Sequence, residues 1–142
     1  MRITALSKSP KVFDPVRKKQ VVKTPEEMIR QWVLKQMIDF LAFPKGLISV
    51  EARVGNLRRA DILVFRKANA ELVPLLIVEC KADALDDEKA FLQAIGYQSN
   101  KRAPFLCIAH PLGIRTFWKQ EGVLQSAPFL PPYPQLIKRV LG

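Results

Sequence analysis

Three side chains in the middle of the sequence have the types and spacing to bind a metal ion and act on a phosphate. Glu79 and Lys81 end the most apolar run of the chain, and Asp61 opens another apolar run. Successive side chains of a strand alternate faces, so Glu79 and Lys81 point the same way. Two converging carboxylates repel each other unless a cation lies between them, and hard oxygen ligands suit Mg²⁺ or Mn²⁺. We therefore expect Asp61 and Glu79 to be metal ligands, with Lys81 acting on the attacking water and on the charge that develops on phosphate.

Two more polar residues are expected near this site. Glu26 lies in a helix that starts at Thr24, and at about 100° per residue it projects onto the same face as the apolar side chains. Glu27 is the competing acid, at the border of that face. Gln93, four residues before Tyr97, is a neutral hydrogen-bonding group on a second expected helix.

Each of these residues alone also has a purely structural explanation. An acid at a helix start interacts favourably with the helix dipole. Asp61 can pair with Arg58 or Arg59, Glu79 with Lys81 can be an ion pair at a strand end, and Gln93 can be a surface residue. The chemical interpretation depends on the whole set, because its order along the chain brings all members to one edge of a sheet.

The elements that must position these residues alternate between helical and strand-like patterns. A threonine N-cap followed by proline and two glutamates marks the first helix start. The patterns predict, in order, a helix at 24–43, strands at 48–54, 59–65 and 72–81, a helix at 85–99, and strands at 104–109 and 114–118. Such alternation predicts an α/β fold with a mixed central sheet flanked by helices. We expect residues 1–23 to form a basic, extended N-terminal arm with a short strand at 20–22, and residues 24–142 to form one domain.

Charge and composition narrow the functional classes. The net charge of +10 favours a polyanionic partner, because neutralising phosphates drives sequence-independent binding to nucleic acids. No apolar run approaches the roughly 20 residues that span a bilayer, and no secretory signal is recognisable. Cys80 and Cys107 fall in apolar segments and are expected to be core thiols of a cytoplasmic protein. One histidine and two cysteines cannot supply a closed zinc site.

The motifs resemble a known family. The matching runs are Thr-Pro-Glu-Glu-Met-Ile-Arg at 24–30, Arg-Ala-Asp-Ile-Leu-Val-Phe at 59–65 and Leu-Ile-Val-Glu-Cys-Lys-Ala at 76–82, followed by Gln93 and Tyr97. This arrangement resembles the N-terminal nuclease domain of type I restriction enzyme R subunits, a member of the PD-(D/E)xK superfamily. The resemblance covers roughly residues 20–110. It implies a restriction-endonuclease-like αβββαβ core, a divalent metal and double-stranded DNA as substrate.

Carried over by motif, the resemblance makes Asp61 and Glu79 the metal ligands and Lys81 the catalytic lysine. It makes Glu26 the helix acid and Gln93 the accessory glutamine. The sequence has no Gly-x-x-x-x-Gly-Lys-[Ser/Thr] loop for ATP, so we expect any motor or specificity subunit to be a separate partner, and a double-strand cut to need a homodimer.

The sequence thus predicts a metal-dependent DNA endonuclease that hydrolyses phosphodiesters with metal-activated water. The alternative from another class is a nuclease-derived DNA-binding or assembly module without turnover.

Overall fold

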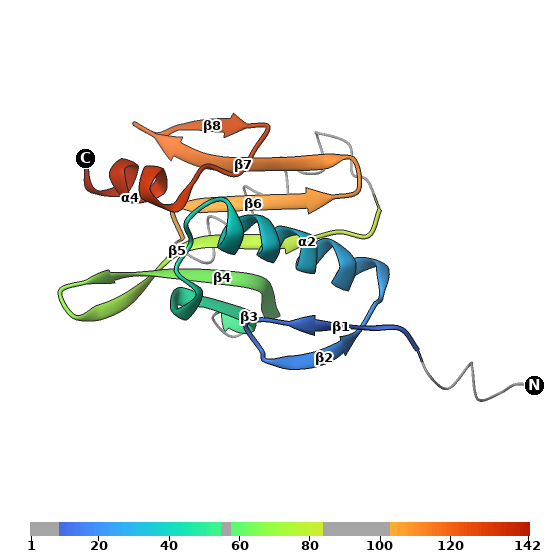
Figure 1. Ribbon diagram of the computed structural model, residues 1–142. Helices are drawn as coiled ribbons and strands as arrows, with labels where there is room; N and C mark the ends of the chain where they lie inside the picture. The colour runs from blue at the N-terminus through green and yellow to red at the C-terminus, as the bar shows by residue number, and fades with distance from the viewer. Residues whose placement is uncertain (1–8, 55–57, 84–102) are drawn as a thin grey trace, which may run out of the picture.

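In the part of the chain that the structure describes, a mixed β-sheet carries two α-helices packed on one face (Figure 1). The computed structural model describes residues 9–54, 58–83 and 103–142. Six strands follow one another across the sheet in chain order: β3 (Ile48–Val54), β4 (Arg58–Ala68), β5 (Glu71–Cys80), β6 (Phe105–His110), β7 (Gly113–Gln120) and β8 (Val123–Ala127). All neighbours are antiparallel except β5 and β6, which are parallel. This confirms an α/β fold with a mixed sheet.

The specific αβββαβ core is not confirmed by the described elements. The helix expected at 85–99 lies outside the described residues. Strand β3 has its predicted range, β4 is longer than predicted, and β5 is displaced by one residue from its predicted range. Pro74 pairs with Phe65, directly after a register shift between Val64 and Phe65. An irregularity of this kind is where a proline, which lacks the amide proton of a ladder bond, is tolerated.

The first helix, α2 (Pro25–Asp39), begins as predicted and ends four residues early. The Thr24 hydroxyl accepts a hydrogen bond from the Glu27 N–H at 3.1 Å, and proline occupies the first turn. The chain then turns through Ala42, whose φ of 59° is left-handed, and reaches Pro44. The apolar residues after Asp39 therefore belong to the turn and not to the helix.

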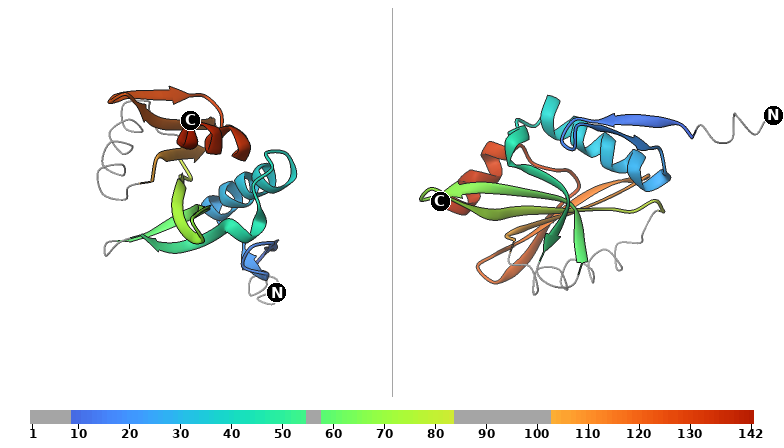
Figure 2. Two further views of the ribbon diagram at one scale, coloured as in Figure 1. Left: turned by 90° about the vertical axis from the view of Figure 1, so that its left-hand side faces the viewer. Right: turned by 90° about the horizontal axis from the view of Figure 1, so that it is seen from below.

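A large apolar cluster fills the space between the sheet and its two helices. From α2 it includes Val33, Leu34 and Met37, and from α4 (Tyr133–Leu141) it includes Leu136, all with no exposed surface. A second cluster lies on the opposite face of the sheet and includes Leu63, Ile77, Leu106, Ile108 and Phe117. Figure 2 shows the twist of the sheet and α2 lying across one of its faces. Burial on both faces explains why β5 and β6 read as continuous apolar runs.

Residues 11–22 form a hairpin where the sequence predicts an extended arm, and the short strand expected at 20–22 is confirmed. Strands β1 (Lys11–Asp14) and β2 (Lys19–Val22) form an antiparallel hairpin beside α2 (Figure 2). Asp14 is completely buried and its Oδ1 accepts hydrogen bonds from the Val16 and Arg17 N–H groups at 2.8 Å. An aspartate that binds the backbone two residues ahead organises a turn without any hydrophobic periodicity.

The C-terminal part contains a strand and a helix that the sequence does not predict. The Glu121-Gly122 turn leads into β8, and residues 133–141 form the helix α4. Pro134 lies in the first turn of α4, where a proline is tolerated because its missing N–H is not needed. The Tyr133 N–H donates to the Leu41 carbonyl at 2.9 Å, which fastens α4 to the end of α2. No helix in the described parts of the chain has the length and apolar character to cross a membrane.

Candidate active site

Asp61 lies at a fork in the sheet, where β4 separates from β5. The ladder between the two strands ends at the pair Ile62 and Val78, whereas β4 continues as far as Arg58 in its pairing with β3. Beyond this point, the Cys80 N–H donates to Asp61 Oδ2 at 2.7 Å. A side-chain carboxylate therefore takes the place of a backbone carbonyl at the end of the ladder, and Asp61 reaches the residue directly after Glu79.

Glu79 and Lys81 lie at the end of β5, as the sequence predicts. Glu79 is only 6 % exposed, and its Oε1 lies 3.8 Å from Lys81 Nζ. The Lys81 N–H donates to the Ala109 carbonyl at 2.8 Å and extends the parallel pairing with β6 by one residue. Alternation along β5 directs Glu79 to the same face as Ile77, away from α2. Any meeting of the Asp61 and Glu79 carboxylates must therefore occur around the strand end.

The acid that α2 turns toward the sheet is Glu27, not Glu26. Glu26 is exposed, so the prediction that it lies on the core-facing side of the helix is wrong. The buried side consists of Glu27, Arg30, Val33, Leu34 and Met37. Apolar periodicity does not detect Arg30, because its side chain is charged. The observed buried face is therefore shifted by about one residue from the predicted one, which brings Glu27 inward in place of Glu26.

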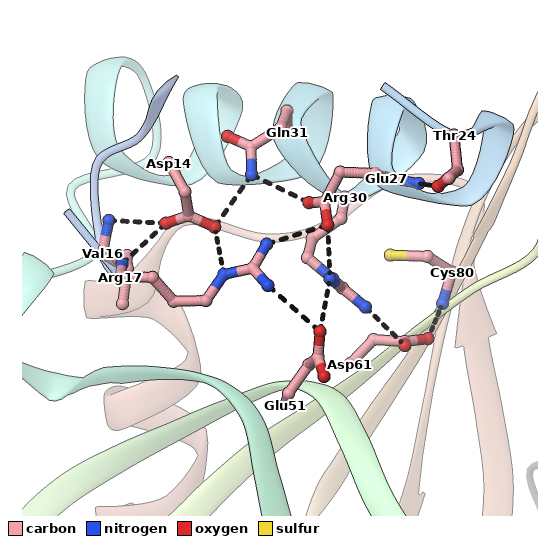
Figure 3. Close-up of polar contacts among 10 residues, drawn as sticks. All are labelled: Asp14, Val16, Arg17, Thr24, Glu27, Arg30, Gln31, Glu51, Asp61 and Cys80. Carbon is pink, nitrogen blue, oxygen red and sulfur yellow. Dashed lines mark hydrogen bonds and ion pairs between the residues drawn. The ribbon is translucent and has the colours of Figure 1, made fainter. Parts of the chain in front are cut away.

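Two arginines connect four carboxylates beneath α2 (Figure 3). Arg30, which is 5 % exposed, donates to Glu27 Oε1 at 2.8 Å, to Glu51 Oε1 at 3.3 Å and to Asp61 Oδ1 at 3.0 Å. Arg17 donates to Glu27 Oε1 at 2.8 Å and to Glu51 Oε1 at 3.0 Å. Helix, sheet and hairpin are thereby joined by charge-assisted hydrogen bonds, which are stronger than neutral ones.

The hairpin contributes its own acid to this network. Asp14 Oδ2 accepts from Arg17 Nε at 2.8 Å and from Gln31 Nε2 at 2.9 Å. Gln31 Nε2 also donates to Glu27 Oε2 at 3.0 Å. The β1–β2 hairpin is therefore part of the support for Glu27, whereas the sequence predicts residues 1–23 to be an arm outside the domain.

The network keeps its buried acids ionised. Burial alone would raise the pKa of Glu27, but hydrogen bonds from Gln31 and Arg17 and the charges of Arg30 and Arg17 outweigh it, so the pKa lies below its ordinary value. The pKa of Asp14 is lowered in the same way, because hydrogen bonds from Arg17, Gln31 and Val16 outweigh burial. These are the shifts expected where hydrogen bonding to the charged form exceeds desolvation.

The donor chemistry of the site is compatible with a hard divalent cation, but a complete ligand set is not assembled. Among the residues that the structure describes, no group of three or more His, Cys, Asp and Glu side chains is arranged to hold a metal. Asp61 and Glu79 would supply two carboxylates, and Mg²⁺ commonly takes one or two while keeping waters or substrate oxygens. Asp61 Oδ1 accepts a hydrogen bond from Arg30 and Oδ2 accepts one from the Cys80 N–H, and a carboxylate oxygen has a second lone pair that can bind a metal ion.

The ion-pair network beneath α2 carries a net negative charge, although the chain as a whole is basic. Asp14, Glu27, Glu51 and Asp61 bring four negative charges and Arg17 with Arg30 bring two positive ones, a net of −2 for these six side chains. A local excess of two carboxylates is a favourable environment for a divalent cation.

The remaining predicted residues have mixed outcomes. Gln93 and Tyr97 lie outside the described residues. Cys80 and Cys107 are buried free thiols, as expected of core residues. Burial raises the pKa of both, that of Cys107 to about 12, so neither is a thiolate at neutral pH.

Arg115 lies on the same face of the sheet as Glu79, a placement that the sequence does not predict. Glu79 pairs with Ile108 on β6, and Ile108 pairs with Arg115 on β7, so the three lie in one row across the sheet. Cross-strand partners share a face, which puts Arg115 on the face of Glu79, two strands and about 10 Å away between Cα atoms. Its guanidinium also donates to Ser126 Oγ at 3.1 Å. The pairing could not be read from the sequence, because it depends on the register of a parallel strand pair.

Fold and site together define a mixed α/β domain with an acidic, lysine-containing strand end supported by a helix acid. The family model for the type I restriction enzyme R protein N terminus matches residues 25–128, more than half of the chain. The chain belongs to this family, which supports a nuclease-related role in restriction. Neither a curated protein nor a solved structure matches it.

Proposed function

We propose that the protein is a divalent-metal-dependent DNA endonuclease of the PD-(D/E)xK type. The observation that carries the proposal is the strand end itself: Asp61 reaches the backbone at Cys80, next to Glu79, and Lys81 Nζ lies 3.8 Å from Glu79 Oε1. Membership of the type I restriction enzyme R protein N-terminal family supports DNA as the substrate and other subunits as partners.

Asp61 and Glu79 would hold Mg²⁺ or Mn²⁺ in this function, as two oxygen ligands. Such an ion, when bound, polarises phosphoryl oxygens and lowers the pKa of water. Glu27 takes the position of the helix acid in place of Glu26, because it is the one turned toward the sheet. Arg30 positions Glu27 and Asp61 relative to each other, since one guanidinium donates to both.

Lys81 is the residue that acts directly on the substrate in this proposal. Its ammonium lies beside Glu79 and is partly exposed, so it can donate to an incoming phosphate oxygen and can orient a water molecule for in-line attack. Arg115, in the same row as Glu79, is suited to contact a neighbouring phosphate of the backbone.

The test compares Lys81→Ala with the wild type in a plasmid-nicking assay with Mg²⁺ and with Mn²⁺. Losing a positioned acid–base or charge-stabilising group should lower the cleavage rate by on the order of 10²-fold, while calorimetric metal binding stays intact. Glu79→Gln should lose both metal binding and cleavage. Wild-type rates in a folded Lys81→Ala protein would contradict the proposal, because they would reduce the Glu79–Lys81 pair to a structural ion pair.

A second candidate is a DNA-binding or assembly module without turnover. The observation in its favour is that both Asp61 oxygens already accept hydrogen bonds, one from Arg30 and one from the Cys80 N–H. This candidate predicts salt-sensitive DNA binding with no metal-dependent nicking, and with no loss of binding in Lys81→Ala beyond that caused by one charge.

A further inference from the structure

A cavity of about 690 Å³ lies at the end of the sheet opposite the candidate active site, between α4 and the strands β6 and β7. Along β6, Phe105 pairs with Leu76 and Ala109 pairs with Cys80, so the cavity is near the start of the strand and the site near its end. Four residues of strand separate the two places by about 13 Å. Figure 1 shows α4 at the end of the sheet away from the point where β5 ends.

The walls of the cavity combine positive charge with flat apolar surface. Lys138 and Arg139 come from α4, whereas Lys119 on β7 follows Trp118, so strand alternation directs its side chain to the opposite face of the sheet. Phe105 and Trp118 contribute aromatic surface. None of the described side chains that line the cavity is Asp or Glu. Two cations without a carboxylate among them suit an anion, and the aromatic walls suit a ligand with a planar apolar part.

Arg139 and Trp118 already form a stacked pair. The Arg139 guanidinium carbon lies 4.7 Å from the Trp118 ring centroid, and Gln120 Oε1 accepts from Arg139 Nη1 at 3.4 Å. Phe105 packs against Trp118, with 6.2 Å between the two ring centroids. Trp118 Nε1 is buried and has no hydrogen-bond partner among the described residues, which leaves a donor for any acceptor that reaches it. An arginine held in this way is a preformed plane on which a base can stack.

We propose that this cavity binds one nucleotide unit of single-stranded nucleic acid, with the base stacked on the Arg139 guanidinium that covers Trp118 and the phosphate on Lys138. Duplex DNA keeps its bases inside the helix, so only an unpaired nucleotide can offer both a ring and a phosphate to the same cavity. The inference goes beyond the proposed nuclease function, because it uses neither the acids of the strand end nor a metal. An acidic peptide offers charge without the planar ring and is the less complementary ligand.

The experiment uses the intrinsic fluorescence of Trp118. The chain has two tryptophans, and Trp32→Phe leaves Trp118 as the only one. In EDTA, which prevents metal-dependent cleavage, oligothymidylate should change Trp118 fluorescence saturably. Lys138→Glu in this background should weaken binding about tenfold, the scale expected for losing a charged contact. Lys67→Glu is the matched control: it reverses an exposed charge on β4 and should change affinity by less than about threefold.

Further arms separate the sources of the ligand chemistry. Thymidine monophosphate that binds as tightly as the oligonucleotide would assign the cavity to free nucleotides, whereas tighter binding of the oligonucleotide assigns it to a strand. The proposal is overturned if Trp118 fluorescence does not respond, if Lys138→Glu and Lys67→Glu weaken binding equally in proteins of equal melting temperature, or if polyglutamate binds more tightly than the oligonucleotide. Because no step needs the strand-end acids, these outcomes are independent of the Lys81→Ala cleavage assay.

Discussion

Replacing Arg30 should lower the free energy of unfolding more than replacing any exposed charged residue of α2. Arg30 is 5 % exposed and donates to three carboxylates, one each from α2, β3 and β4. Breaking a buried ion pair by removing one partner typically costs about 3–5 kcal/mol, because the remaining charge stays buried and uncompensated. Arg30→Met keeps most of the aliphatic volume, so the loss reports the charge and its hydrogen bonds.

The contacts that remain place the expected loss at the lower end of this range. Glu27 retains Arg17 and Gln31, and Asp61 retains the Cys80 N–H. The desolvation cost of the guanidinium is also removed, and its Nε has no partner among the described residues. We therefore expect the free energy of unfolding to fall by about 3 kcal/mol, a large part of the 5–15 kcal/mol typical of a domain.

Urea unfolding at pH 7, followed by circular dichroism, measures this loss. Lys35→Met is the matched control on the same helix: its side chain is 65 % exposed and it pairs with Asp39 at 3.2 Å. A surface pair of this kind contributes at most about 1 kcal/mol. The double variant with Glu27→Gln should show a coupling energy of at least about 1 kcal/mol. A loss below about 1 kcal/mol in Arg30→Met, or additive effects with Glu27→Gln, would refute the network as a source of stability.

Three further predictions concern metal, pH and salt. Mg²⁺ or Mn²⁺ should raise the melting temperature of the wild type, because a ligand that binds only the folded state stabilises it, and Asp61→Asn should abolish this increase; an unchanged increase would remove Asp61 as a ligand. The pKa values of Asp14 and Glu27 are lowered from 3.8 and 4.5, so the stability that they contribute is complete above about pH 5 and is lost as pH falls through the lowered values. Urea titrations should show this loss flattened in Glu27→Gln but not in Glu26→Gln, and equal behaviour of the two variants would argue against the buried acid. The DNA affinity of the chain, whose net charge is +10, should fall steeply with salt, by about 0.9 in the slope of log K against log salt for each phosphate contact; a slope near zero would mean that this charge does not contact DNA.

Local signals in the sequence were sufficient for the helix start and most of the sheet. Thr24 and Pro25 predicted the start of α2 because capping depends on neighbouring residues alone. The continuous apolar runs predicted β5 and β6, which are buried on both faces, and the alternation of apolar and polar residues predicted β3. The motif order also placed Asp61, Glu79 and Lys81 near one strand end.

The parts that were missed depend on contacts between distant residues. The inward position of Glu27 follows from its pairing with Arg17 and Arg30, and charged residues give no periodic apolar signal. Asp14 is buried because Arg17 and Gln31 satisfy it. Ion-pair networks of this kind are invisible to hydropathy, so the hairpin that they hold was interpreted as an arm outside the domain.

The charge distribution gives the proposed metal a role before any chemistry occurs. The chain as a whole is strongly basic and attracts phosphate, yet the six side chains joined beneath α2 carry a net charge of −2. A phosphate approaching Asp61 would be repelled at the place where the proposed reaction needs it. A divalent cation held by Asp61 and Glu79 would reverse that local repulsion. Arg30 would not, because its positive charge is already balanced by the three carboxylates to which it donates. The same arrangement that makes the fork stable without substrate therefore makes productive phosphate binding at the fork depend on metal, while DNA binding elsewhere on the basic surface does not.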